Sequence, residues 1–254
     1  MPSLSFQHIV MDYPDEQGSA IRALDGFSLE VAPHSAVALI GPSGCGKSTL
    51  LRIACGLQQP TAGSFALDGA AVDKPRRKTA LIPQDYGLLP WKTVYHNAEL
   101  GLRIAGMDLQ TRRQRTQRAL AQVGLAGFER LYPRQLSGGM KQRLALARAL
   151  AMDVDLLLMD EPLSALDALL REEIQDALLA LWQERQHTQI LITHSIEEAV
   201  FLGQTIVVLT PRPGRVAAVI DNPAMGSPDY RSAQAFQQTC VAVRSVLAEA
   251  GGGR

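Results

Sequence analysis

Hydrophobic residues near the N-terminus alternate with polar ones, as in strands with one buried face. Two short alternating segments, 4–10 and 27–31, have this period of two, and a polar stretch at 15–19 separates them. A further strand is expected at 64–68, because a turn signal at Gly69 follows it. The pattern predicts that the chain begins with an antiparallel sheet.

A second kind of apolar segment is nearly continuous, which is typical of parallel strands that are buried on both faces. These runs lie at 36–40, 80–82, 156–159, 190–192 and 206–209. Helical patterns separate them, and the clearest, from about 169 to 185, places its large apolar side chains on one face. We therefore expect an α/β fold with a mostly parallel core sheet beside an antiparallel β subdomain.

The region from 94 to 152 is strongly helical and contains no convincing strand. We interpret it as a helical subdomain, about 87–153, that is inserted between two strands of the core sheet. The whole main domain then spans 1–220, and a short helical tail spans 221–254. A helix near 233–250 is expected in this tail, and the three glycines that follow it are expected to be disordered.

The composition limits the classes of function. The 254 residues include 25 Lys and Arg and 25 Asp and Glu, a balance that argues against binding nucleic acid through bulk charge. No apolar stretch approaches the roughly 20 residues needed to span a bilayer, and no secretory signal is visible. The three cysteines, Cys45, Cys55 and Cys240, lack metal-type spacing and favour a reduced, cytosolic compartment.

A glycine-rich motif after the run 36–40 matches the phosphate-binding pattern G-x-x-x-x-G-K-[ST] at every fixed position. Its residues are Gly41, Pro42, Ser43, Gly44, Cys45, Gly46, Lys47, Ser48 and Thr49. The glycines allow successive backbone N–H groups to face an anion, and a helical run from 49 to 57 adds its dipole. A flexible Gly/Ser loop before a helix is the alternative.

Three side chains of this loop have expected roles toward a nucleotide. Lys47 supplies a positive charge for the β- and γ-phosphates, and Ser48 offers a hydroxyl to Mg²⁺ with Thr49 close to the phosphate. Cys45 stands inside the loop, so alkylation of its thiol is expected to inhibit and ATP to protect.

Two carboxylates, Asp160 and Glu161, end the apolar run at 156–159. A buried strand that terminates in paired acids indicates a binding site, because an unpaired buried charge is costly. Asp160 is placed to hold Mg²⁺ directly or through water, and Glu161 is then free to act as general base on a water. The alternative is a surface turn with two acids.

A second glycine-rich segment precedes a helix expected at 141–151. Ser137 is a good N-cap for this helix, and Gly138 and Gly139 leave backbone N–H groups open to an anion. Capping alone is the simpler interpretation of these residues.

Taken together, the motifs resemble those of the ATP-binding subunits of ABC transporters over nearly the whole chain. The features in that family's order are the phosphate loop, Gln84 after Leu81-Ile82-Pro83, Leu136-Ser137-Gly138-Gly139, Asp160-Glu161, Ser164-Ala165-Leu166-Asp167 and His194. Met140 stands where the family usually has Gln after this signature. The resemblance implies an ABC-type P-loop NTPase fold and ATP hydrolysis, with ATP and Mg²⁺ as ligands.

The resemblance also implies roles for single residues. Tyr13 is expected to stack on adenine, and His194 to donate a hydrogen bond to the γ-phosphate. Gln84 is expected to contact Mg²⁺ or the attacking water and to sense the membrane subunit. The signature 137–139 is expected on the γ-phosphate held by a second copy of the chain, and Asp167 at that dimer interface.

The segment 86–91 follows Gln84 and contains Leu88, Leu89 and Trp91. Such side chains are costly to expose unless a partner covers them, so one prediction is a groove for a short helix of a permease. The other is that Leu88 and Trp91 simply pack the helical insertion. A basic cluster at 112–118 is interpreted as a solvated helix face, with anionic lipid headgroups as the alternative.

The segments 88–91 and 209–215 look like those of nitrate, sulfonate and taurine importers. This similarity implies import of a small solute through separate permease subunits, served indirectly by a solute-binding protein, at the cytoplasmic face of the cell membrane. The alternatives are a soluble ABC-type ATPase that acts on DNA, ribosomes or iron–sulfur assembly, and an exporter ATPase.

Overall fold

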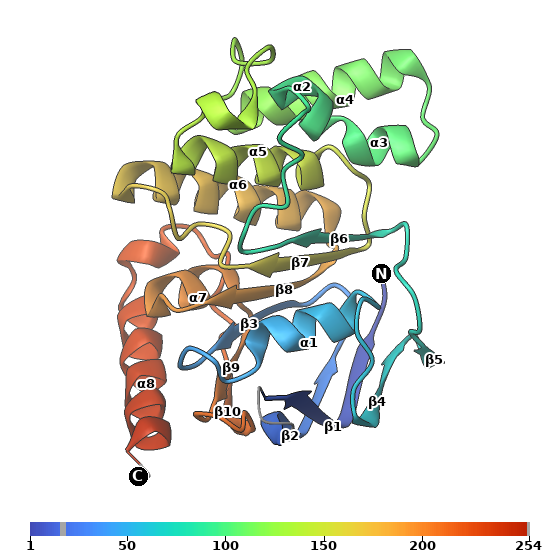
Figure 1. The fold of residues 1–254 in the computed structure, drawn as a ribbon. Helices are drawn as coiled ribbons and strands as arrows, with labels where there is room; N and C mark the ends of the chain where they lie inside the picture. Colours follow the sequence, from blue (N-terminus) through green and yellow to red (C-terminus); the bar gives the residue numbers. More distant parts are fainter. Residues whose placement is uncertain (16–18, 253–254) are drawn as a thin grey trace.

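A six-stranded sheet runs through the centre of this computed structural model, which describes residues 1–15 and 19–252 (Figure 1). Its strands are β3 (Ala36–Ile40), β6 (Thr79–Ile82), β7 (Leu156–Asp160), β8 (Thr188–Thr193), β9 (Thr205–Leu209) and β10 (Val216–Asp221). The order is β10-β9-β3-β8-β7-β6, and all pairs except β10–β9 are parallel. The mostly parallel core sheet is therefore confirmed, and every continuous apolar run forms one of its strands.

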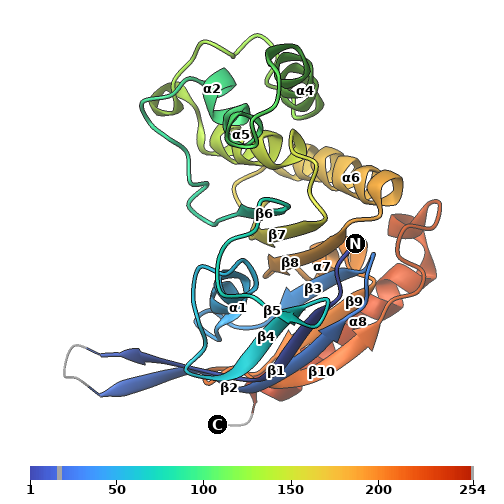
Figure 2. The same ribbon diagram turned by 90° about the vertical axis from the view of Figure 1, so that its right-hand side faces the viewer.

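A four-stranded antiparallel sheet packs beside it. Its strands are β1 (Leu4–Pro14), β2 (Ala20–Val31), β4 (Ala62–Leu67) and β5 (Ala70–Ala71), in the order β2-β1-β4-β5. The first two strands are longer than predicted, and they extend together away from the body (Figure 2). Register shifts after Phe6, Ile9 and Met11 interrupt the simple alternation, and for this reason the outer half of each strand was not predicted. The predicted polar connection at 15–19 lies partly outside the described residues.

The helical insertion lies between β6 and β7, which are neighbours in the sheet (Figure 1). It contains α2 (Val94–Ala98), α3 (Leu100–Ile104), α4 (Leu109–Gln122), the 3-10 helix η1 (Pro133–Gln135) and α5 (Gly138–Leu150). The fully helical character of this region is confirmed. The subdomain bounds 87–153 and the division at residue 220 stay predictions.

The basic cluster of α4 is not a uniformly solvated face. Nε of Arg112 lies 2.8 Å from Oε2 of Glu99, whose side chain is buried, so this arginine neutralises an acid inside the helical layer. Arg113 and Arg118 are exposed, as the solvated-face interpretation requires.

The remaining helices cover the sheet. They are α1 (Lys47–Ala54), α6 (Ala168–Arg185), α7 (Ile196–Leu202), the 3-10 helix η2 (Tyr230–Ser232) and α8 (Gln234–Gly251). The expected disorder of Gly251 is wrong, because this residue belongs to α8, while Gly253 lies outside the described residues. Neither α7 nor β10 was predicted, although Ser195, whose Oγ accepts from the amide of Glu198, is a recognisable N-cap for α7.

Strand β3 is buried on both faces, and this fixes the loop that follows it. Ala38 and Ile40 belong to the apolar core on one side of the sheet, and Val37 and Leu39 to the core on the other. Replacing one such large side chain by alanine costs about 2–5 kcal/mol in typical cores.

Within residues 1–15 and 19–252, we find no helix with the length and hydrophobicity that crossing a membrane requires.

Candidate functional site

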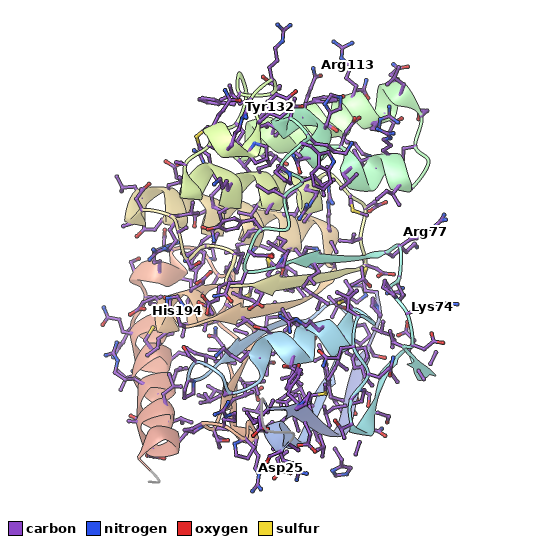
Figure 3. All side chains as sticks on the ribbon, viewed as in Figure 1. Asp25, Lys74, Arg77, Arg113, Tyr132 and His194 are labelled. Carbon is purple, nitrogen blue, oxygen red and sulfur yellow. The ribbon has the colours of Figure 1, made fainter. Side chains whose placement is uncertain are left out.

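The predicted chemical residues gather where the parallel strands end. The loop from Gly41 follows β3, Asp160 is the last residue of β7, and His194 follows β8. Parallel strands end at one edge of the sheet, and His194 lies on the side toward which β7 points (Figure 1, Figure 3). Open α/β sheets bind ligands outside this edge.

The phosphate-loop motif curves around its own lysine. Gly44 (φ 76°) and Gly46 (φ 95°) take left-handed backbone conformations, and Gly46 is the N-cap of α1. A Cβ on Gly46 would also lie 2.5 Å from Cδ2 of Leu24, so only glycine fits there. Lys47, 7% exposed, donates from Nζ to the carbonyl oxygens of Gly41 (2.8 Å) and Pro42 (2.9 Å). The loop thus holds an ammonium group inside its curve at the start of a helix.

Cys45 points into the protein and away from the loop's open side. Its side chain is completely buried, Sγ lies 3.7 Å from Nζ of Lys47, and burial raises the pKa of the thiol. This burial argues against the expectation that alkylation of Cys45 inhibits and that ATP protects, because a reagent has no direct access to the thiol.

A cavity of about 410 Å³ opens over the loop. Of the site residues predicted from the sequence, those that line this cavity are Tyr13, Ser43, Gly44, Gly46, Lys47, Ser48, Thr49, Gln84, Asp160 and Glu161. The hydroxyl of Tyr13 lies 3.0 Å from Oγ1 of Thr49 and donates to Oε1 of Gln58 at 3.1 Å. Ile21, which pairs with Tyr13 across β1 and β2, also lines the cavity. One wall is therefore aromatic and aliphatic, and the floor is polar.

The two carboxylates face different partners. Asp160 is 8% exposed, and burial raises its pKa, while a hydrogen bond with Ser48 and the charges of Arg52 and Lys47 act in the opposite direction. Oε2 of Glu161 lies 3.5 Å from Nδ1 of His194, and both side chains are accessible. The backbone of Glu161 is left-handed (φ 50°), and its amide donates to the carbonyl of Ile192 on β8 at 2.9 Å.

The oxygen donors at this site suit a magnesium ion. Asp160 and Ser48 supply a carboxylate and a hydroxyl, and Gln84 lines the same cavity. Among the described residues, no group of three or more His, Cys, Asp and Glu side chains is placed to hold a metal ion. Mg²⁺ is commonly bound by one or two carboxylates together with substrate phosphates, so this donor set fits the ion only beside a phosphate ligand.

The signature residues lie outside this cavity. Ser137 caps α5 by accepting from the amide of Met140 at 3.2 Å, which confirms its predicted N-cap, and Asp167 caps α6 by accepting from the amide of Leu170 at 3.1 Å. Gly138, Gly139, Gly41 and Pro42 are also absent from the lining. One copy of the chain therefore does not place the signature on its own phosphate loop.

A buried glutamine that was not predicted joins the signature helix to the acid pair. Nε2 of Gln142 donates to the carbonyl of Glu161 at 3.0 Å, and its Oε1 accepts from the amide of Ala165 at 2.9 Å. Its position four residues before buried Leu146, on the apolar stripe of α5, was the available signal.

A second cavity, of about 650 Å³, adjoins the first. Its lining residues are Ser48, Leu51, Arg52, Leu57, Leu81, Pro83, Gln84, Asp85 and Asp160. Gln84 thus lines both cavities. Leu57 is largely exposed and Trp91 is 71% exposed, whereas Leu88 packs against the core. Leu88 thus packs against the apolar core that the helical insertion shares with the sheet, whereas the prediction that Trp91 packs the insertion is wrong.

Comparison with known proteins identifies the family. A model of the ABC transporter family matches residues 24–164. The taurine import ATP-binding protein TauB of Yersinia pestis is 48% identical over 194 residues, which cover 76% of each chain. TauB of Chromobacterium violaceum is 45% identical over 223 residues, covering 88% of this chain and 84% of that protein.

Solved structures agree with this assignment. A dimeric bacterial ABC transporter cassette matches 86% of this chain and 98% of its own, with a TM-score of 0.80 and 31% identity. A second structure, of a post-hydrolysis cassette bound to ADP and phosphate, matches with a TM-score of 0.79. The chain therefore belongs to the ABC transporter family, in which it is an ATP-hydrolysing subunit.

Proposed function

We propose that this ATPase subunit powers the import of a small solute, of the sulfonate, nitrate or taurine type, through separate permease subunits. The arrangement of Ser48 and Asp160 beside Lys47, with Glu161 and His194 next to them, carries the catalytic part of the proposal. The names of the TauB relatives support the direction of transport and the class of solute.

The phosphate loop and the polar floor of the cavity bind the triphosphate. Backbone N–H groups of 41–49 face the phosphates, and Nζ of Lys47 exchanges its carbonyl partners for phosphate oxygens. Ser48 and Asp160, with Gln84, are the residues that hold Mg²⁺. When bound, the ion neutralises phosphate charge. Tyr13 and Ile21 form the apolar wall for adenine.

Glu161 is the residue placed to activate water. Its carboxylate lines the cavity and remains partly accessible, so it accepts a proton from a water that approaches the γ-phosphate. His194, 3.5 Å away, orients this carboxylate and donates toward the γ-phosphate. Gln142 fixes the backbone of Glu161 from behind, so the signature helix α5 and the base move as one unit.

A second copy of the chain completes each site. The signature Ser137, Gly138 and Gly139 lies outside its own cavity, and its amide groups are free to meet the γ-phosphate held by the partner copy. Asp167 then lies at the shared interface. The similarity to a dimeric cassette supports this arrangement.

The cavity beside Gln84 is the proposed seat of a short permease helix. Leu57 and Leu81 give it apolar walls, and exposed Trp91 lies on the segment that follows Gln84. Because Gln84 borders both cavities, a change at the phosphates reaches the docked helix through a single side chain. The subunit accordingly works at the cytoplasmic face of the cell membrane, with a solute-binding protein as an indirect partner.

Glu161→Gln tests the catalytic assignment. The variant is expected to bind ATP and to lose nearly all hydrolysis, so ATP should trap the dimer, visible as a shift in size-exclusion chromatography. Glu172→Gln, which changes an exposed acid on α6, is the matched control and should behave like the unmodified chain. Undiminished turnover by Glu161→Gln would remove this residue as the base.

Co-purification from membranes tests the transport assignment. Identification of two permease chains and a solute-binding protein is the expected result for an importer. Recovery of ribosomes or DNA without a membrane protein would instead favour a soluble ATPase, and a permease gene with no solute-binding protein gene beside it would favour export.

A further inference from the structure

The loop 210–215 lies directly against the phosphate loop. A Cβ built on Gly214 would lie 1.9 Å from the carbonyl oxygen of Cys45, so the two backbones approach as closely as glycine allows. The amide of Gly214 donates to the carbonyl of Ala23 at 2.9 Å, and its own carbonyl accepts from the amide of Asp25 at 3.1 Å. Loop 210–215 is therefore fixed to both the phosphate loop and β2.

Polar contacts hold loop 210–215 in one shape. Oγ1 of Thr210 donates to the carbonyl of Pro213 at 3.1 Å and accepts from the amide of Arg215 at 3.0 Å. Nε of Arg215 donates to Oδ2 of Asp25 at 3.0 Å, and Nη1 of Arg22 donates to Oδ1 of the same carboxylate at 3.0 Å. Asp25, on the antiparallel sheet (Figure 3), thus anchors the far end of the loop.

Arg212 is the basic residue of this loop that faces the site. It lines the 410 Å³ cavity together with Tyr13, Ala23 and Lys47. Within the described part of the chain, no carboxylate lies within ion-pair distance of Arg212, in contrast to Arg215. A rigid loop therefore presents an unpaired guanidinium to a cavity that already contains the phosphate-binding lysine.

We propose that Arg212 is a nucleotide-binding residue whose guanidinium contacts the phosphate nearest the ribose. This inference rests on the proposed ATP site. Lys47 serves the distal phosphates, and the wall of Tyr13 and Ile21 serves the base. The loop of Arg212 is bonded through Gly214 to Ala23, which lies on β2 between Ile21 and the backbone next to Gly46, so Arg212 meets the part of the nucleotide between base and distal phosphates. Arg212 is exposed at the rim of the cavity, and the planar fork of arginine matches two phosphate oxygens and attracts them by its charge.

The test compares Arg212→Ala and Arg212→Lys with the unmodified chain in calorimetric titrations with ADP and with a non-hydrolysable ATP analogue. Arg212→Ala is expected to weaken both nucleotides by the same factor, about tenfold or more, because both carry the proximal phosphate. Arg212→Lys should recover part of the loss, since it keeps the charge but not the fork. Arg118→Ala, an exposed arginine on α4, is the control and should change neither affinity.

Each of the following outcomes would overturn the inference. Unchanged affinities in Arg212→Ala would show that the side chain makes no contact. A loss confined to the ATP analogue would assign it to the γ-phosphate, and an altered preference for ADP over GDP would assign it to the base. If Lys47→Ala abolishes nucleotide binding and Arg212→Ala leaves it intact, the role of Arg212 is overturned and the proposed ATP site is not. Failure of the unmodified chain to bind ADP would overturn the proposed site as well.

Discussion

Arg148 of α5 donates from Nη1 to the carbonyl oxygen of Gly87 at 2.6 Å, and this bond joins the signature helix α5 to the segment 86–91 that follows Gln84. Its Nη2 donates to the carbonyl of Tyr86 at 2.8 Å. Tyr86 and Gly87 both have left-handed backbones, so this segment turns sharply where the arginine holds it. One side chain thus ties α5, whose N-cap is Ser137, to the residues that follow Gln84, and burial lowers the pKa of the Arg148 guanidinium.

Arg148→Ala is predicted to destabilise the fold and to loosen this segment. Two carbonyl oxygens lose their donor together, and hydrogen bonds of this charged kind contribute about 1.5–3 kcal/mol each. Urea unfolding should show a free energy of unfolding lowered by about 2–4 kcal/mol, and proteolysis near 85–92 should be faster. Arg148→Lys keeps the charge and should lose less. Equal stability of Arg148→Ala and the unmodified chain would mean that the two bonds contribute little.

His187 makes stability depend on pH. The side chain is 2% exposed, and burial lowers its pKa from 6.5 to about 4, while the nearby Gln189 side chain acts in the opposite direction. The unfolded chain therefore takes up the proton at a higher pH than the folded chain. Stability is complete above about pH 6.5, decreases as the pH falls, and loses up to about 3 kcal/mol from this residue by pH 4.

Urea unfolding between pH 4 and 8 measures this effect. The unmodified chain should lose stability steadily below pH 6.5, and His187→Leu, which removes the titrating group, should show a smaller loss over the same interval. Parallel pH curves for the two proteins would contradict the assignment to His187.

The central strands and the phosphate loop could be predicted because their signals are local. Five apolar runs have no polar face to present to solvent, and the glycine-rich motif carries its chemistry in consecutive residues. The outer halves of β1 and β2 could not be predicted, because register shifts break the alternation on which the prediction depends. Strand β10 was also not predicted, because it is half-exposed and its first residue follows a proline-rich loop that carries no strand pattern.

The residues missed at the site depend on packing between distant segments. Arg212 lines the cavity from a loop whose Gly214 packs against Cys45, a residue about 170 positions earlier in the chain. Gln142 reaches the backbone of Glu161 because α5 and β7 share a core. The apolar stripe of α5 indicates that Gln142 is buried, but it does not indicate which group Gln142 contacts. The acids and the phosphate loop were predicted from their residue types, and the structure adds which atoms face one another.

Trp91→Ala is predicted to separate transport from basal hydrolysis. The indole is 71% exposed, so its removal should leave the free energy of unfolding within about 0.5 kcal/mol and the ATPase of the isolated subunit unchanged. If Trp91 contacts the permease, the permease should raise the ATPase activity of the unmodified chain but not that of Trp91→Ala. Leu88→Ala is the informative control, because Leu88 packs against the core and should lower stability instead. Normal transport by Trp91→Ala would exclude Trp91 from the coupling surface.

The three cysteines are predicted to resist alkylation in the folded chain. Cys45, Cys55 and Cys240 are all buried, and burial raises the pKa of each thiol, so little thiolate is present or accessible at neutral pH. Mass spectrometry after brief treatment with N-ethylmaleimide at pH 7 should find the native chain largely unlabelled and the urea-unfolded chain labelled three times. Nucleotide should make no difference to the native result, because the phosphate loop already covers Sγ of Cys45. Rapid labelling of Cys45 that ADP prevents would instead require the loop to open and turn this thiol outward on the timescale of the reaction.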